Sequence, residues 1–536
     1  MSDNQIATLE AGGKRRAVHA GELLVQEGAR SDDFFVILSG KVAIVAEDET
    51  GNPQIMRVHG PRRFLGELGD LEGHAAFYTA EVIEAGEVLV IPTQQVRRVV
   101  AHDPVLSDLI LRAYLMRRCL LIEQGTGFRI IGSCYSPDTA RLREFASRNR
   151  LPHRWLDLER DPNAERLLRR FGLSPQDTPV VIWAGEVLRN PSNTQLARLV
   201  GLPVPDTVGD EWDLVVVGAG PAGLGAAVYG ASDGLSTAAL EWTAIGGQAG
   251  TSSRIENYLG FPAGISGADL AERAALQADK FGARIVVSAQ AARLQSDGGQ
   301  HAIGLTNDVS VTARAVVLAT GARYRKLDVP GIERFEGNGV YYAATQQEAL
   351  VCGTGPVVVV GAGNSAGQAT IFLATRVVRV HLLIRGDDMA KSMSRYLVDQ
   401  IQRHPRVSVY PCTEIREVHG DGTLKTVVAE DKRTGERHWI DTTALFVFIG
   451  AVPNTSWLTG VITLDTHGFV PTGPDALYTH DDRELPISAR RPLPLETSLP
   501  GVFAAGDVRS RSVKRVATAV GEGSMAIRQI HEYLLT

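Results

Sequence analysis

The first residues that could support chemistry lie in the stretch DLVVVGAGPAGLGAAVYG, where an apolar run enters a glycine-rich turn. Gly218, Gly220 and Gly223 stand in the pattern G-x-G-x-x-G, which permits a tight turn, close approach of the backbone to a pyrophosphate, and close packing of helix and strand. Ala222 lies inside this turn and is a further candidate. Glu241 ends the next apolar run, where a carboxylate can accept hydrogen bonds from ribose hydroxyls. The pattern predicts a dinucleotide site whose phosphates face a helix N-terminus.

A second turn of the same kind, VVVVGAGNSAGQ, has the pattern G-x-G-x-x-A. The apolar run that follows it ends at Arg385 without an acidic residue. A carboxylate there would repel a 2′-phosphate, whereas an arginine can bind one, so the pattern favours NADPH, with NADH as the alternative. An arginine that is merely solvated would favour neither. The candidate residues of this site are Gly361, Gly363, Asn364, Ser365, Ala366 and Arg385.

The cysteines of the chain are few and widely separated. Cys119, Cys134, Cys352 and Cys412 form no C-x-x-C pair. This spacing excludes a disulfide scaffold or a cysteine-based zinc site and suits a reducing compartment. We therefore expect no metal centre, and the sequence alone names no catalytic residue.

Composition describes a globular protein. The chain has 536 residues, of which 44% are hydrophobic and 22% charged, and a chain of this length divides into about three to five domains. The net charge of −6 gives no reason to expect a nucleic-acid partner. The N-terminal stretch lacks the apolar core of a signal peptide, and the longest apolar runs are too short to cross a bilayer. We expect a cytoplasmic protein without membrane insertion.

The pattern of elements changes along the chain. The first hundred residues predict short strands, and DDFFVILSGKVAIVAED alternates on both sides of Ser39-Gly40, which predicts a β-hairpin. A helix follows, with an apolar stripe of Leu109, Ala113, Met116 and Leu120. Strands and helices then alternate over residues 126–203, and a turn-rich linker occupies 201–210. The remainder is α/β throughout, so the fold class is multidomain: an all-β section with a helix, a small α/β module, and two α/β dinucleotide domains.

Residues 211–536 resemble the low-molecular-weight thioredoxin reductases. Beyond the two turns, GGQAGTSSRIENYLGFP resembles the loop along the flavin, VVLATGARYR and FVFIGAVPNT resemble the two crossings between domains, and GVFAAGDVRSRSVKRVATAVGEG resembles the C-terminal flavin element. The residues at the family's binding positions are Gly247, Gln248, Asn257, Thr320, Gly321, Gly450, Gly506, Asp507 and Ala517. The resemblance implies bound FAD, a homodimer, an FAD-binding domain formed by 211–325 and 451–536, and an NAD(P)H-binding domain, 326–450, inserted in it.

The redox cysteines of that family are missing. The family pattern C-A-T-C-D, just before the nicotinamide turn, reads here Ala343-Ala344-Thr345-Gln346-Gln347. Because one thiolate must attack the flavin and a second thiol must resolve the product, the usual route to thioredoxin is closed. The resemblance then implies that hydride passes from NADPH to FAD and that electrons leave to another acceptor: a ferredoxin-like protein, a thiol protein or a small molecule. The alternative is a non-catalytic flavin- and nucleotide-binding sensor.

Residues 1–124 resemble the cyclic-nucleotide-binding β-roll of the catabolite activator family, through LVQEGARSDDFFVILSGKVAIV and FLGELGDLEGHAAFYTAEV. Gly66 and Glu67 match the ribose-binding start of that family's phosphate cassette. The position of its arginine reads Ala76, and Phe77-Tyr78 replace small residues. Because an unpaired phosphate in a dry pocket would be costly, we expect a structural or sensory role, with cyclic-nucleotide binding as the alternative.

Residues 126–203 resemble a thioredoxin or glutaredoxin fold. Cys134 lies at the strand-to-helix turn, where a helix N-terminus is expected to lower the pKa of a thiol, and Pro179 stands at the position of the family's cis-proline. The single thiol either acts through a mixed disulfide or is an idle residue of a docking module. Cys352 is likewise either a displaced redox thiol or a small buried residue.

Overall fold

The computed structural model describes residues 1–47, 53–66, 74–207, 211–252, 254–336, 339–342, 344, 349, 352–477 and 490–535. Two compact units make up the chain. One comprises residues 1–210, 240–244 and 276–290, and the other comprises residues 211–239, 245–275 and 291–536. None of the described helices is both long and apolar enough to span a lipid bilayer.

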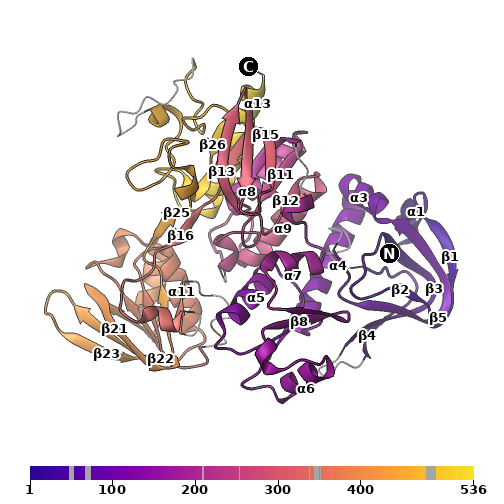
Figure 1. Cartoon of the computed structure of the whole chain (residues 1–536), viewed down its shortest axis with the longest axis horizontal. Coiled ribbons are helices and arrows are strands. Elements are labelled where there is room, and N and C mark those ends of the chain that lie inside the picture. Colours follow the sequence, from indigo (N-terminus) through magenta and orange to yellow (C-terminus); the bar gives the residue numbers. More distant parts are fainter. Residues whose placement is uncertain are drawn as a thin grey trace. The chain divides into compact units, whose positions relative to one another are not determined.

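The β-roll, residues 1–124, is an antiparallel sheet with helices beside it (Figure 1). Its strand order is β1-β5-β3-β4, and β2 pairs with β5. The strands are β1 (Lys14–Val18), β2 (Leu23–Val25), β3 (Asp33–Glu47), β4 (Pro53–His59) and β5 (Thr79–Pro92). The helices are α1 (Asp3–Glu10), α3 (Thr93–His102) and α4 (Pro104–Glu123). One apolar cluster fills the inside of the sheet, and a second joins the sheet to the helices.

The predicted hairpin at Ser39-Gly40 is wrong, because β3 runs through this point as one strand. Gly40 has a φ of 83°, and the pairing of β3 with β5 shifts register on both sides of it. These shifts are β-bulges. A bulge needs the same permissive glycine as a tight turn but bends a strand instead of reversing it.

The predicted helix after the sheet is confirmed as α4, and its predicted stripe is partly right: Leu109 and Ala113 are half-buried against the apolar cluster that joins the sheet to the helices, but Met116 is not. The buried face contains Leu106, Ile110 and Tyr114, together with the polar Arg118, while Met116 is 66% exposed. Arg118 is buried because it lies over a ring of the β-roll and donates to a backbone carbonyl of the next module. A helix that packs on two partners has two buried faces, which a single apolar stripe does not describe.

The module predicted as residues 126–203, called the thioredoxin-like module after the resemblance in its sequence, has a four-stranded sheet of order β7-β6-β8-β9, with β6 and β7 parallel and β8 and β9 antiparallel to their neighbours. The peptide bond before Pro179 is cis, as the sequence predicts. The strands are β6 (Phe128–Gly132), β7 (His153–Asp157), β8 (Val180–Trp183) and β9 (Glu186–Arg189). The helices are α5 (Pro137–Arg148), α6 (Pro162–Arg170) and α7 (Asn193–Leu199), whose caps Ser136, Asp161 and Ser192 each accept from a backbone N–H of the first turn.

Two later segments belong to the same compact unit as these modules. The backbone N–H of Val287 donates to the Pro203 carbonyl over 3.0 Å, and the Asn149 side chain donates to the Thr243 carbonyl over 3.1 Å. Leu276, near the end of α9 (Gly267–Lys280), joins the apolar cluster between the β-roll sheet and its helices. The short strand β12 (Arg284–Val286) lies in the second of these segments.

The flanking domain, predicted as residues 211–325 and 451–536, is built on a sheet with the order β11-β10-β15-β14-β13, and β26 pairs with β15. Its strands β10, β15 and β26 are parallel, while β13 and β14 form an antiparallel extension. The strands are β10 (Glu211–Val217), β11 (Thr237–Leu240), β13 (Ala291–Asp297), β14 (Gln300–Leu305), β15 (Ser310–Leu318) and β26 (Val502–Ala504). The helices α8 (Pro221–Ser232) and α13 (Val516–Leu534) pack through small residues: a Cβ atom at Gly523 would collide with the Ala222 carbonyl oxygen.

The inserted domain, predicted as residues 326–450, has a fully parallel sheet of order β17-β24-β18-β19-β20. Helices α11 (Asn364–Ala374) and α12 (Arg395–Arg403) contribute to the apolar cluster on one face of the sheet. The strands are β17 (Val340–Tyr341), β18 (Val357–Val360), β19 (Val380–Leu383), β20 (Val407–Tyr410) and β24 (Ala444–Val447). Two short strands, β16 (Ala322–Tyr324) and β25 (Ala451–Pro453), connect this domain to the flanking one.

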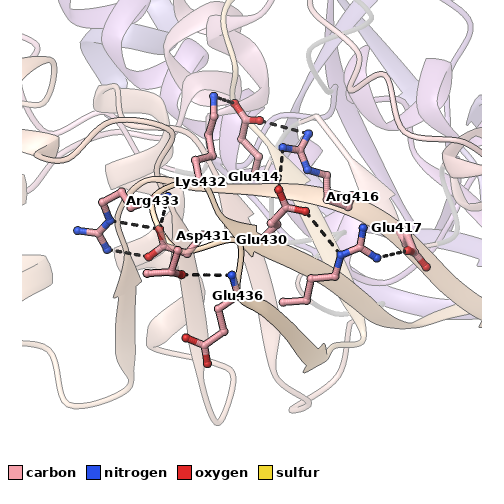
Figure 2. Close-up of polar contacts among 10 residues, drawn as sticks. Glu414, Arg416, Glu417, Glu430, Asp431, Lys432, Arg433 and Glu436 are labelled. Carbon is pink, nitrogen blue, oxygen red and sulfur yellow. Dashed lines mark hydrogen bonds and ion pairs between the residues drawn. The ribbon is translucent and has the colours of Figure 1, made fainter.

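A three-stranded meander covers the other face of that sheet. It consists of β21 (Thr413–Asp421), β22 (Thr423–Asp431) and β23 (Arg437–Asp441), and its inner side chains join the apolar cluster on that face. Its outer side carries the ion pairs of Figure 2, in which Glu430 pairs with Arg416 (3.3 Å) and with Arg437 (3.5 Å). Exposed pairs contribute little to stability. Their effect is to keep the outer side polar, so the meander buries only one face.

Candidate functional site

The first glycine-rich turn joins β10 to α8. Gly218 has a φ of 106°, and a Cβ atom there would collide with the carbonyl oxygen of Ala319. A Cβ atom at Gly223 would collide with the Gly218 carbonyl oxygen. At Gly220, by contrast, the nearest neighbouring atom would be the Gly247 Cα at 3.9 Å. Packing within the protein therefore requires the outer glycines, while Gly220 leaves backbone open to a ligand.

The second turn, between β18 and α11, repeats this arrangement. Gly361 has a φ of 142°, and a Cβ atom there would collide with the Phe448 carbonyl oxygen. A Cβ atom at Gly363 would have no neighbour within 4 Å among the described residues, and Ala366 is fully buried beneath the turn. The chain thus contains the same arrangement of backbone twice, once in each α/β domain. The turn at Gly218–Gly223 is called the first cradle and the turn at Gly361–Ala366 the second cradle.

Both cradles end at the N-terminus of a helix. Gly220 caps α8 and Gly363 caps α11, and a glycine at the cap position has no side chain that could accept from the first N–H groups. The first N–H groups of a helix lack intrahelical partners and carry partial positive charge. Ala222 and Ser365 lie in the first turns of these helices, among groups suited to a pyrophosphate.

The loop predicted to lie along the flavin is tied to the first turn and to the domain crossing. The N–H of Gly246 donates to the Ala219 carbonyl over 2.8 Å, and the Cα atoms of Gly247 and Gly220 lie close together. The Gln248 side-chain amide donates to the Ala322 carbonyl. The first residues of the loop are therefore held in a defined position beside the first cradle.

The two chain crossings between the α/β domains form a single hinge. The Thr320 hydroxyl donates to the Asn454 carbonyl over 3.0 Å, and the Asn454 side chain donates to the Thr320 carbonyl over 2.9 Å. The Asn454 N–H donates to the Gly321 carbonyl, and the Arg325 N–H donates to the Gly450 carbonyl. Together with the antiparallel pairing of β16 and β25, these bonds give the inserted domain one pivot.

The turn before the C-terminal helix is held by a buried acid. Gly506 has a φ of 77°, and its N–H donates to the Glu522 carboxylate over 2.7 Å. Arg509 donates to the other carboxylate oxygen over 2.5 Å. A Cβ atom at Gly506 would meet the Ala222 Cβ at 2.8 Å, so this turn abuts the first cradle. Three stretches that are distant in sequence therefore meet: the first turn, the flavin loop and the C-terminal turn.

Asp507 is a half-buried carboxyl beside that meeting point. Burial raises the pKa of Asp507, the nearby charge of Glu522 raises it further, and Lys514 opposes both effects. A buried carboxylate is stabilised by hydrogen-bond donors, and the hydroxyls of a ribityl chain are such donors. Ala517 lies in the first turn of α13, close behind this carboxyl in sequence.

Two more predicted flavin-site residues have clear positions. Glu241 follows β11 directly and is buried, and one of its carboxylate oxygens accepts from the N–H groups of Thr243 (2.8 Å) and Ala244 (3.2 Å). The carboxylate is thereby oriented by its own turn. Asn257 is exposed on the flavin loop.

Arg385 lies just beyond β19, beside the second cradle, and is exposed. No ion pair of Arg385 occurs within the described residues, whereas the nearby Lys391 pairs with Asp387 over 2.6 Å. Asp388 is also engaged, because it accepts from the Ala390 N–H. Arg385 is thus the cation here whose charge is not matched by a carboxylate. The Asn364 side chain accepts from the Ser394 N–H over 2.6 Å, which fixes the start of α11 against α12.

The expected activation of Cys134 is wrong. The pKa of this thiol is raised by burial first and then by the charge and hydrogen bond of Asp157. The Asp157 carboxylate, itself buried at the end of β7, accepts from the Cys134 N–H over 3.1 Å.

The other sequence-based expectations for cysteine chemistry have mixed outcomes. Cys352 is buried in the apolar core of the inserted domain, which favours the small buried residue over the displaced redox thiol. Ala344 is buried, while Ala343 and residues 345–348 lie outside the described residues, so the position of the missing pair has no structural description. Glu67 also lies outside them.

Sequence reasoning missed Glu522 and Asn454. A glutamate inside VGEGSMAIRQI, on a helix that is otherwise apolar on one face, was the available signal for Glu522. Asn454 stands in the return crossing FVFIGAVPNT, but nothing in one sequence tells that it closes the hinge.

Comparisons with known proteins identify relatives of two parts of the chain. The family model for pyridine nucleotide-disulphide oxidoreductases matches residues 212–523, and the model for the cyclic nucleotide-binding domain matches residues 15–103. Thioredoxin reductase of Treponema pallidum is 33% identical over 61% of this chain and 98% of that protein. A 34.2 kDa protein in the rubredoxin operon of Clostridium pasteurianum is 33% identical over 60% of this chain and 97% of that protein.

Solved structures give the same result. The thioredoxin reductase of T. acidophilum aligns with a TM-score of 0.54 and 29% identity, over 61% of this chain and 100% of that one. The thioredoxin reductase of Lactococcus lactis aligns with a TM-score of 0.53 and 26% identity, over 60% of this chain and 99% of that one.

Proposed function

Because the chain belongs to the pyridine nucleotide-disulphide oxidoreductase family, we propose that it is an FAD-dependent NAD(P)H oxidoreductase that delivers electrons to an acceptor other than a disulfide of its own α/β domains. Hydride from NADPH to FAD is the proposed first half-reaction. The acceptor is a ferredoxin-like protein, a thiol protein or a small molecule.

The observation that carries the proposal is the pair of backbone cradles. Gly220 and Gly363 both leave open space in front of a helix N-terminus, while Gly218 and Gly361 are forced by packing. Two such cradles in two domains joined by one hinge support two dinucleotides that can approach each other. A flavin bound at the first cradle would supply the chemistry of taking a hydride and releasing electrons one or two at a time.

The residues that the sequence assigns to the flavin suit FAD. Glu241 presents an oriented carboxylate for ribose hydroxyls, and Asp507 presents a half-buried carboxyl for donors of the ribityl chain. Gln248 is fixed by its bond to Ala322 and would border the flavin. The chain's own contribution is binding and orientation.

The second cradle supports NADPH over NADH. Arg385 offers a guanidinium without a carboxylate partner among the described residues, next to the place where a 2′-phosphate would lie. Only one arginine of the three in the family's H-R-R-x-x-x-R pattern is kept, so the preference rests on this side chain.

The cysteine inventory supports an unusual acceptor route. No C-x-x-C pair exists in the sequence, Cys352 is buried, and the pKa of Cys134 is raised. A neutral thiol is a poor nucleophile at neutral pH. These facts favour transfer from the flavin to a separate partner over transfer to an internal thiol.

Anaerobic titration of the purified chain tests the proposal. NADPH should bleach the visible absorbance of the flavin, and the reduced protein should then pass electrons to ferricyanide or a ferredoxin. Thioredoxin should remain oxidised when offered to the same reduced protein. A chain that purifies without FAD and does not take it up contradicts the proposal. A flavin that neither NADPH nor NADH reduces supports the non-catalytic sensor instead.

A further inference from the structure

The stretch FLGELGDLEGHAAFYTAEV of the β-roll, called the cassette below, ends in side chains that are buried among other side chains of the protein. Ala76, Phe77 and Tyr78 are exposed by 0%, 0% and 3%. Ala76 and Tyr78 belong to the apolar cluster inside the sheet, so the interior of the roll is filled at the position where the resembled family places its arginine. Phe77 leaves this cluster and packs against the thioredoxin-like module.

The partner of Phe77 is Trp183, the last residue of β8. The two rings are stacked, with centroids 5.0 Å apart and planes inclined by 24°. The Trp183 indole N–H donates to the Glu27 carboxylate over 2.9 Å, so the same side chain contacts a second segment of the β-roll. Stacked aromatic pairs that also satisfy their polar atom are strong anchors of an interface.

Two backbone contacts lie beside this pair. The Ala75 N–H donates to the Val200 carbonyl over 3.2 Å. Gly28 has a φ of 81°, and a Cβ atom there would collide with the Ala184 Cβ. The β-roll therefore meets the thioredoxin-like module through two separate stretches of its chain, residues 27–28 and 75–77.

Helix α4 binds the backbone at the start of the cassette. The Arg117 guanidinium donates to the carbonyl oxygens of Gly66 (2.5 Å) and Phe64 (2.8 Å) and lies 4.6 Å from the centre of the Phe64 ring. Because α4 is the helix that leads into the thioredoxin-like module, these bonds couple the cassette to the connection between modules.

The next residue of α4 reaches the other end of the cassette. Arg118, which is 2% exposed, lies 5.6 Å from the centre of the Phe77 ring and donates to the Arg150 carbonyl of the thioredoxin-like module over 3.4 Å. Both ends of the cassette and both modules thus converge on one turn of α4.

From this convergence we propose that the cassette face of the β-roll is the docking surface for the chain's own thioredoxin-like module, which occupies it in place of a cyclic nucleotide. The two modules form one body, and Cys134 is held in a fixed position on it. This arrangement excludes a thioredoxin-like module that moves Cys134 between distant partners. The β-roll supports that module and needs no small ligand to do so.

Hydrogen exchange of the full-length protein tests whether the β-roll and the thioredoxin-like module stabilise each other. Phe77→Leu keeps apolar volume but removes the stacked ring, and Trp183→Phe keeps a ring but removes the bond to Glu27. Since an aromatic pair contributes about 0.5–1.5 kcal/mol, a fold-change of about 2- to 10-fold in amide exchange is expected in each variant. The increase should appear in both modules, in peptides covering β6 and β8 as well as β3 and β5. The control is Trp439→Phe, at an exposed tryptophan of the inserted domain, which should change neither.

Exchange that rises only on the mutated side of the contact, or in neither module, overturns the proposal. The Trp183→Phe variant keeps the test informative if Phe77→Leu does not fold. Titration of the full-length protein with cyclic AMP and cyclic GMP at millimolar concentration should give no binding heat and no protection of residues 74–78. Saturable binding with protection there would show that a nucleotide, and not the module, is the natural occupant.

Discussion

Replacing Arg385 by Ala tests how the second cradle selects its coenzyme. The guanidinium of Arg385 is exposed and has no carboxylate partner among the described residues, so removing it breaks no contact of the fold. The variant should therefore keep its flavin and its stability. What it should lose is the attraction for a 2′-phosphate.

The size of that loss follows from charge and distance. Two unit charges about 4 Å apart attract by about 1 kcal/mol in water, and a 2′-phosphate carries nearly two negative charges. The expected loss is about 2 kcal/mol, or about 30-fold in kcat/KM for NADPH, with kcat/KM for NADH almost unchanged. Because the site is exposed, added salt should shrink the difference.

The assay is steady-state reduction of ferricyanide with each coenzyme at low ionic strength. Arg433→Ala, an exposed arginine of the meander that pairs with Asp431 over 2.7 Å, is the charge-matched control and should leave the NADPH/NADH ratio unchanged. An Arg385→Ala enzyme with the parent ratio refutes the reasoning. A ratio that instead falls in Lys391→Ala refutes it too, because Lys391 is already paired with Asp387.

Three further outcomes are expected. Asp157→Asn should lower the pKa of Cys134 and speed its alkylation by iodoacetamide at neutral pH, since the carboxylate raises that pKa. In the parent, alkylation of Cys134 should accelerate as the pH rises. A variant whose alkylation has the same pH profile as the parent would contradict this. Glu522→Gln removes a buried charge that holds the C-terminal turn and should cost about 2 kcal/mol, measured as weaker FAD retention and a lower Tm, whereas Glu532→Gln on the same helix should not. Asp507→Asn should stabilise the apoprotein at neutral pH, because a carboxyl whose folded pKa is raised opposes folding once ionised and ceases to do so as the pH falls through that pKa. An apoprotein destabilised at neutral pH would contradict this.

Sequence patterns located both cradles because the conformation and packing of each turn require glycine. Gly218 and Gly361 adopt positive φ values and face carbonyl oxygens of adjacent strands, so no other residue fits the turn. The need is the same in every dinucleotide turn, which is why spacing alone identifies it. The cis bond before Pro179 was predictable through the resemblance of residues 126–203 to a thioredoxin or glutaredoxin fold.

Features that depend on partners distant in sequence were not predictable in this way. A glycine at positive φ serves a turn or a bulge equally well, so the path of β3 through Gly40 is decided by its pairing with β5. Arginine is usually a surface residue, and Arg118 is buried only because two modules meet on α4. The pKa of Cys134 depends on Asp157, which another strand supplies.

The most direct test of the central claim removes all sulfur nucleophiles that a cysteine can provide. Cys119, Cys134 and Cys412 are replaced by Ser and the buried Cys352 by Ala, and the NADPH-dependent reduction of ferricyanide is measured under anaerobic conditions. The expected rate of ferricyanide reduction by this variant is within about two-fold of the parent, because the electrons reach and leave the flavin without a thiol. A folded, flavin-bound variant that is reduced by NADPH but no longer passes electrons on would contradict it.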